Sequence, residues 1–295
     1  DYRIVTIVDV SQLGVFSEAS TYPYIVILQK LTKKNNKIQV YLPDSINLEE
    51  KKPLQIEQNS LNLNEPFLFN LSKEELFILN KITGEQVIDI FRAKPTTKNI
   101  GEGNSIAITN REVESYRLLK SSKKIEKKKE WVIRTPAILM KKICFVPTAR
   151  IITSNDYVPV NTVYIIHSIK DIPLEYLLAI LNSKLIGYYA RRKYGTTAMR
   201  GGFIELRTFE IKGIPIKIDS KIFPQITKLV THLLSLNQKL NIINEKQTDE
   251  KTRLEKEIQK TDDEIDQEVY KLYGITKEEQ KIIEESLKRL KKMKK

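Results

Sequence analysis

The stretch from Leu174 to Lys217 constrains the fold of this chain more than any other part of the sequence. It opens with an apolar run, LEYLLAILNSKLI, whose large residues recur at helical spacing. A basic segment with glycines follows, and then an extended segment, GGFIELRTFEIKGIPIK. From Lys184 to Lys217, eight lysines and arginines stand against Glu205 and Glu210. The pattern predicts either a helix that presents a cationic loop to a polyanion, or an ordinary solvated basic loop.

The order of these parts resembles a known family. The helix with LLAILNSKL, the basic-aromatic linker and the segment GGFIELRTFEIKGIPI are similar to the C-terminal specificity region of TaqI-like adenine-N6 DNA methyltransferases. The same region occurs in the fused type IIG restriction-modification enzymes. A second string, TDDEIDQEVYKLYGITKEEQKII, resembles the C-terminal helices of the type IIG group. The resemblance implies a target recognition domain that reads the sequence of double-stranded DNA.

The overall charge agrees with a polyanionic partner. The chain has 295 residues and a net charge of +13. No long apolar span or lipidation signal supports a membrane partner. The one cysteine, Cys144, is expected in a buried strand, and His167 and His232 are too distant in sequence for a metal motif. We therefore expect a cytoplasmic protein that binds DNA, with no metal site.

The sequence predicts an α+β fold in three parts. The resemblance implies that residues 1–42 are the terminal strands of a methyltransferase-like domain, the end of an α/β methyltransferase sheet. Residues 43–218 are expected to form a mixed, β-rich target recognition domain that contains a helix between Ser72 and Phe91, which Gly84 would interrupt. Residues 219–295 are expected to form a C-terminal helical hairpin or short coiled coil and a last basic helix.

Local signals within the last part predict where its helices end. Gly274 can end the second helix of the hairpin, and Thr276 with Glu279 forms a capping box for the last helix. The acidic cluster around Asp263 and Asp266 is expected on a solvated helix face.

The N-terminal part carries one candidate substrate contact. Residues 3–10 and 24–30 predict buried strands, and the Val-Phe pair and loop between them resemble the last hairpin of the same family's methyltransferase domain. The resemblance implies that Phe16 packs against a flipped target adenine, as an aromatic wall can. The alternative is that Phe16 fills a hydrophobic layer. Because the chain starts without Met, we expect it to be part of a longer protein.

Candidate DNA contacts gather in two segments rich in cations and hydroxyl groups. Such side chains suit phosphate contacts, whereas an arginine can also grip guanine with two hydrogen bonds. Arg200, beside two glycines, is the first candidate for base reading, and Tyr194 is a candidate for stacking. Alternatives are a plain turn after Pro95 and a structural role for Arg207 beside a buried carboxylate. The full set is Lys94, Thr96, Thr97, Lys98, Arg191, Arg192, Lys193, Tyr194, Thr196, Thr197, Arg200 and Arg207.

The basic segment KKIEKKKEW allows two further interpretations. Its lysines suit a disordered basic loop, and they also suit one wall of a DNA groove.

The motifs that carry catalysis in the resembled family are missing from this sequence. It contains no NPP tripeptide, no glycine motif for S-adenosylmethionine, and no carboxylate-lysine set ordered as in a nuclease. We therefore expect no catalytic residues and no cofactor in this chain. S-adenosylmethionine, and Mg²⁺ if a nuclease is fused, are expected in catalytic domains of a parent enzyme that partner this chain in cis.

Two other functions are compatible with parts of the sequence. A type I restriction specificity subunit would carry a looser version of the same pattern, but such subunits usually have two recognition domains, and no internal repeat is found here. A helical partner-binding protein without DNA specificity would use the predicted hairpin, with its basic charge incidental.

Overall fold

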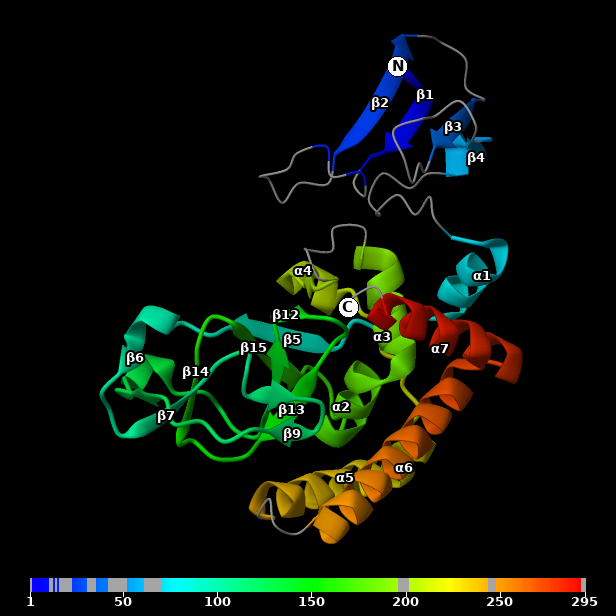
Figure 1. The fold of residues 1–295 in the computed structure, drawn as a ribbon. Helices are drawn as coiled ribbons and strands as arrows, with labels where there is room; N and C mark the ends of the chain where they lie inside the picture. The colour runs from blue at the N-terminus through cyan, green and yellow to red at the C-terminus, as the bar shows by residue number, and fades with distance from the viewer. Residues whose placement is uncertain are drawn as a thin grey trace. The chain divides into compact units, whose positions relative to one another are not determined.

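The computed structural model describes residues 2–10, 13, 15, 23–30, 36–41, 52–60, 71–195, 202–243 and 248–292 (Figure 1). The chain forms two compact units, Asp1–Lys73 and Glu74–Lys295. Helices and mixed sheets are both present, which confirms the α+β class. The predicted boundaries after residues 42 and 218 stay predictions. In the structure, the β-rich region and the C-terminal helices belong to one unit.

The N-terminal unit is built on a four-stranded sheet with the order β2-β1-β3-β4. Its strands are β1 (Tyr2–Asp9), β2 (Tyr24–Lys30), β3 (Lys37–Tyr41) and β4 (Leu54–Glu57). β1 is antiparallel to β2 and parallel to β3, and Ile7, Ile38 and Val40 form a small core. Both predicted strands exist, but β2 is exposed along its length. Among the described residues it pairs with β1 alone and lies at the sheet edge, so its predicted burial is wrong.

Two four-stranded sheets form the β-rich part of the second unit. The first has the order β14-β7-β10-β6 and the second the order β13-β11-β15-β5. The strands of the first sheet are β6 (Ile100–Gly101), β7 (Ser105–Ile108), β10 (Lys124–Ile125) and β14 (Tyr157–Pro159). Those of the second are β5 (Ile88–Arg92), β11 (Ala137–Lys141), β13 (Ala149–Ile152) and β15 (Val163–Ser168). Two short pairs complete this part: β8 (Val113–Glu114) with β9 (Arg117–Leu118), and β12 (Ile143–Cys144) with β16 (Ile204–Glu205).

The second sheet is buried on both faces along β11 and β15. Leu139, Val163 and Ile165 pack on one face, in a cluster with Ile108 of the first sheet. Helix α2 (Leu174–Asn182) contacts β11, β13 and β15. Because β5 pairs with β15 alone among the described strands, the sheet ends at β5. Cys144 is buried in β12, as predicted, and burial raises the pKa of its thiol to about 12.

The apolar run that predicts one helix forms two. Helix α2 ends at Asn182, and α3 (Lys184–Tyr194) starts after Ser183, whose hydroxyl accepts a hydrogen bond of 3.2 Å from the Ile186 amide. Arg191, Arg192, Lys193 and Tyr194 therefore lie in the last turns of a helix, and their placement in a loop was wrong. The cations suit this position because the C-terminal end of a helix carries partial negative charge.

The helix predicted between Ser72 and Phe91 ends shortly before Gly84, the residue expected to interrupt it. Helix α1 spans Lys73–Lys81, and β5 begins at Ile88. Between them the chain passes close to a distant segment. A Cβ atom on Gly84 would lie 2.4 Å from the Ile216 backbone, and Glu85 bridges to Ile216. Only a glycine permits this close approach, and the backbone that makes it is no longer helical.

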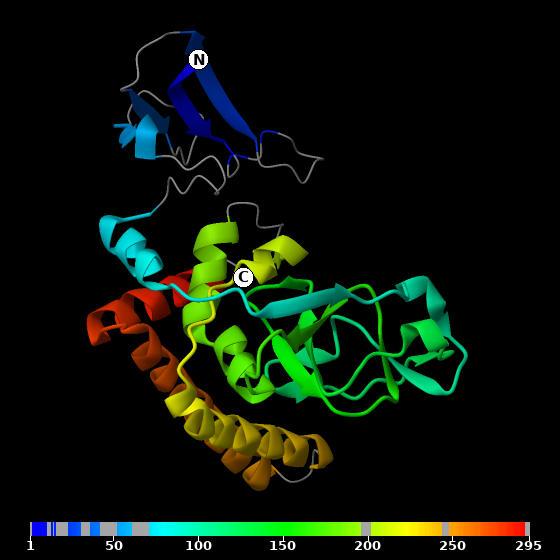
Figure 2. The same ribbon diagram turned by 180° about the vertical axis from the view of Figure 1, so that it is seen from behind.

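The remaining helices are α4 (Thr208–Lys212), α5 (Phe223–Ile242), α6 (Thr248–Tyr273) and α7 (Lys277–Lys292). Helices α5 and α6 lie side by side as the predicted hairpin (Figure 2). Gly274, with φ of +69°, ends α6 as predicted. The Thr276–Glu279 capping box is confirmed by bonds of 2.7 Å and 3.3 Å. None of the described helices is long and apolar enough to cross a membrane.

One predicted solvated position is buried. Asp266 is 3% exposed, and its carboxylate accepts a 2.8 Å hydrogen bond from the Lys184 amide and pairs with the Lys184 ammonium group. Asp263 pairs with the same ammonium group. The acidic cluster therefore joins α6 to the start of α3 instead of facing solvent as a whole.

Candidate nucleic-acid interface

Arg191, the first cation of the predicted DNA-contacting cluster, makes its contacts inside the protein. Arg191 is 7% exposed, and its guanidinium lies 4.8 Å from the centre of the Phe145 ring. It also donates a hydrogen bond to the Gly202 carbonyl. Burial lowers the pKa of Arg191, with a smaller contribution from Arg192, yet an arginine remains charged at neutral pH. These contacts fix the Gly202 backbone to α3.

Arg192 is also bound within the fold. Its guanidinium forms an ion pair with Glu75 of α1 and lies 5.6 Å from the centre of the Tyr188 ring. The pair connects the end of α3 with α1, so Arg192 has a structural partner already.

The next two residues of the cluster lie beside Tyr189. The Lys193 ammonium group is 5.4 Å from the centre of the Tyr189 ring, and the Tyr194 ring meets the same ring edge-on at 6.2 Å. The Tyr194 hydroxyl donates a 3.4 Å hydrogen bond to the Glu210 carbonyl. Both side chains are partly exposed.

Arg207 is the N-cap of α4, and the extended strand expected there ends at Glu205. Its backbone amide donates a 2.6 Å hydrogen bond to the Glu210 carboxylate, and the residue as a whole is exposed. This bond is made by the Arg207 backbone and Glu210 is only partly buried, so the pairing of the Arg207 side chain with a buried carboxylate stays a prediction. Thr196, Thr197 and Arg200, like Phe16 in the N-terminal unit, lie outside the described residues.

The second predicted segment follows β5 as an exposed turn. Lys94, Thr96, Thr97 and Lys98 are all exposed. The Thr96 amide and hydroxyl both donate to the Asn99 side-chain oxygen, at 2.8 Å and 3.1 Å. The Pro95 carbonyl accepts a 2.7 Å hydrogen bond from the Asn161 amide. The plain-turn interpretation and the phosphate-contact interpretation are compatible here, because an anchored turn presents the two lysines.

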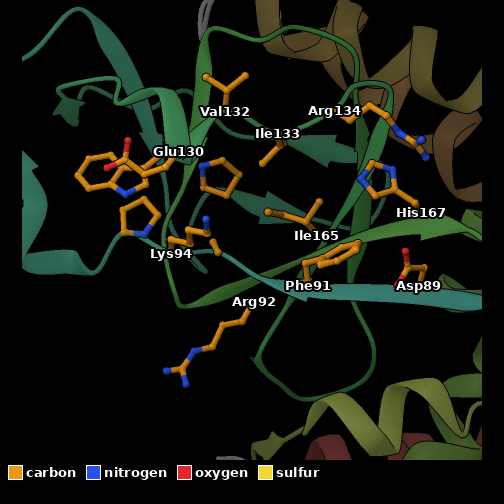
Figure 3. Close-up of a pocket in the computed structure, with 14 residues that line it drawn as sticks. Asp89, Phe91, Arg92, Lys94, Glu130, Val132, Ile133, Arg134, Ile165 and His167 are labelled. Carbon is orange, nitrogen blue, oxygen red and sulfur yellow. The ribbon is translucent and has the colours of Figure 1, made fainter.

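A cavity next to this turn was missed by the sequence analysis. It has a volume of about 430 Å³ and lies between β5 and the segment 130–134 (Figure 3). Its lining includes His167, for which the sequence predicted only that it takes no part in a metal motif. The one signal available in the sequence was the chain's single tryptophan, Trp131, inside a lysine-rich segment. The residues that line the cavity are Asp89, Phe91, Arg92, Ala93, Lys94, Pro95, Glu130, Trp131, Val132, Ile133, Arg134, Pro159, Ile165 and His167.

The lysine-rich segment beside the cavity is ordered into short elements. It contains β10 and a 3-10 helix, Lys129–Trp131, and its lysines from Lys124 onward are exposed. Trp131 packs against the cluster of Ile125 and Val158. From residue 124 to residue 134, five cationic side chains stand against two carboxylates. In the described structure, this segment is a basic wall instead of a disordered loop.

Within the described ranges, no group of three His, Cys, Asp or Glu side chains is placed to hold a metal ion. Exposed cations beside aromatic side chains are instead typical of surfaces that bind nucleic acid.

Comparison with known proteins agrees with this chemistry. Residues 98–216 match the family model described as the TaqI-like C-terminal specificity domain. No curated protein matches the chain. The matched range begins at the exposed turn, includes the basic wall, α2, α3 and α4, and ends where Ile216 bridges to Glu85. Residues 98–216, which are less than half of the chain, are therefore similar to a TaqI-like C-terminal specificity domain.

Proposed function

We propose that this domain recognises double-stranded DNA for an adenine-N6 DNA methyltransferase of the TaqI-like group, to which type IIG restriction-modification enzymes also belong. The observation that carries the proposal is the specificity-domain match over residues 98–216. The net charge of +13 supports it, because phosphate contacts by lysine and arginine supply much of the affinity for DNA.

The contacts of the predicted residues separate two roles. Arg191 and Arg192 hold α3 to its neighbours, so we assign them to the scaffold that positions the interface. Lys94, Lys98 and Arg207 are exposed on anchored backbone, and we assign them to phosphate contacts. Base reading by Arg200 stays a prediction from the sequence.

Catalysis is proposed to belong to a separate domain of the same enzyme. The chain lacks the glycine and NPP motifs, so its own residues do not fit S-adenosylmethionine. That cofactor, with Mg²⁺ where a nuclease is fused, would be bound by the catalytic domains. The contact of Phe16 with a flipped adenine remains part of this proposal.

A salt titration of duplex DNA binding tests the function. The slope of log affinity against log salt should be steep, and Lys94→Ala or Lys98→Ala should each reduce it by about one. Lys256→Ala, which removes an exposed cation from α6, is the matched control and should leave the slope unchanged. Selection from a randomised duplex pool should enrich one sequence, and Arg200→Ala should relax one of its positions. No binding at low salt would contradict the proposal.

A further inference from the structure

The cavity beside β5 has a composition that fits a planar, partly polar group. Phe91 and Ile165 lie directly opposite each other on β5 and β15, and Asp89 and His167 form the next pair on the same face. Side chains two residues apart on a strand share a face, so all four line the cavity from one sheet surface. Ile133, Pro159 and Ala93 add further apolar surface.

The polar groups stand at the two ends of this apolar surface. Figure 3 shows Lys94 and Glu130 at one end, and Asp89, Arg134 and His167 at the other. Phe91 and Ile165 lie between them, while Arg92 points away. An apolar middle with a few polar groups at the rim is the usual composition of a site for a small organic group.

Phe91 is available for stacking. Its side chain is 50% exposed although it lines the cavity, and its ring meets the His167 ring at 6.1 Å and 64°. Burial lowers the pKa of His167, and Arg134 lowers it further against the opposite effect of Asp89. The imidazole is therefore neutral at neutral pH and offers one donor and one acceptor to a ligand.

The cations near the cavity match a ligand that carries phosphate. Lys94 lines it, and Lys98 follows in the same anchored turn. Lys128, in the segment that also contributes Glu130 to the cavity lining, lies 5.0 Å from the centre of the Trp131 ring. Aromatic platforms between cations are the arrangement by which proteins hold unstacked nucleic acid bases.

We propose that this cavity receives one unstacked base of the bound DNA, with the base against Phe91, its polar edge at Asp89, Arg134 and His167, and the adjoining phosphates at Lys94 and the basic wall. The inference rests on the proposed DNA recognition and adds a base-holding site within the specificity domain. A base that has lost its pairing partner, or is unpaired from the start, costs least to place there.

Trp131 provides a direct signal for the test. It is the only tryptophan in the chain and lines the cavity, so the intrinsic tryptophan emission reports on this site. The full chain is titrated with two duplexes of equal length, one fully paired and one with a single bulged adenine. The bulged duplex should bind at least about fivefold more tightly, as one base–aromatic stack allows, and should quench the emission.

The variants separate the cavity from the rest of the interface. Phe91→Ala should abolish the preference for the bulged duplex and most of the quenching, but should bind the paired duplex as the unmodified chain does. Phe77→Ala is the matched control, because Phe77 is 59% exposed on α1, outside the cavity lining. Trp131 is not replaced by alanine, since its packing against Ile125 and Val158 supports the fold.

Three outcomes would overturn the inference, and they are distinguishable. Salt-dependent binding of the paired duplex without bulge preference or quenching removes the base-holding site and leaves the proposed function intact. Quenching by millimolar adenosine monophosphate, but not by either duplex, assigns the cavity to a free nucleotide. Absence of all DNA binding at low salt removes the proposed function together with this inference.

Discussion

At the scale of single residues, the carboxylate of Glu112 is buried and is held by several polar partners. Its side chain accepts hydrogen bonds from the Thr109 amide at 2.8 Å and the Thr109 hydroxyl at 2.6 Å, and it pairs with Lys123. Burial acts to raise the pKa of Glu112, but the bonds from Lys123 and Thr109 outweigh it and hold the pKa below its ordinary value of 4.5. The folded state therefore favours the ionised form.

We expect Glu112→Gln to lower the free energy of unfolding by about 1–3 kcal/mol at pH 7, since hydrogen bonds to a charged group are lost. A depressed folded pKa gives stability that is present above the unfolded pKa and is lost as pH falls through the folded pKa. The difference between the two proteins should therefore shrink as pH falls from about 4.5 through that lower pKa. Urea denaturation of both proteins, at pH 7 and at a pH below the folded pKa of Glu112, measures this difference in unfolding free energy.

The control for this residue is Glu114→Gln, which changes an exposed carboxylate on the neighbouring strand. It should alter stability little at either pH. An equal loss of stability at pH 7 and at low pH in Glu112→Gln would show that the carboxylate charge is not the stabilising feature.

At the scale of elements, the end of α6 depends on one backbone conformation. Gly274 has φ of +69°, and a Cβ added there would meet nothing within 4 Å. The cost of Gly274→Ala is therefore conformational and should be about 1–2 kcal/mol of unfolding free energy.

Gly101→Ala is the matched substitution, because a Cβ at Gly101 also meets nothing within 4 Å and the backbone there is not left-handed. It should be neutral, or should stabilise the protein by up to about 1 kcal/mol, because alanine reduces the conformational entropy of the unfolded chain. Chemical denaturation of both variants compares them directly. Equal effects in the two would contradict the assignment of Gly274 as a strained helix end.

At the scale of the whole molecule, a buried hydroxyl is one of the contacts that join the C-terminal helices to the rest of their unit. The Tyr273 hydroxyl donates to the Pro215 carbonyl at 2.7 Å and accepts from the Lys217 amide at 2.9 Å. Helix α5 packs against α2, and α7 against α3. These contacts place both parts in the unit Glu74–Lys295, and we expect them to unfold together.

Tyr273→Phe should lower the unfolding free energy by about 1–3 kcal/mol, because the buried Pro215 carbonyl and the partly buried Lys217 amide lose their partner. Hydrogen exchange should then increase in α2 and α3 as well as in α6. Tyr270→Phe is the control on the same helix, since the buried Tyr270 hydroxyl has no hydrogen-bond partner among the described residues. Tyr270→Phe should be neutral or stabilising. An increase in hydrogen exchange that is confined to α6 in Tyr273→Phe would contradict joint unfolding.

The sequence by itself determined the features that depend on neighbours along the chain. Apolar periodicity predicted the hairpin of α5 and α6, and local capping chemistry predicted the end at Gly274 and the Thr276–Glu279 box. The helix, linker and strand pattern was enough to predict the match to the TaqI-like specificity-domain model, because those residue types follow one another directly.

Only the tertiary structure decided which partner each polar side chain binds and which residues line the cavity. Arg192 meets Glu75, and Asp266 meets Lys184, across large separations in sequence, so neither partner is visible in local spacing. The cavity likewise combines residues of β5, β15 and the segment 130–134. The pairing of β5 with β15 creates it, and such long-range pairing depends on the packing of the whole sheet more than on either strand's own sequence.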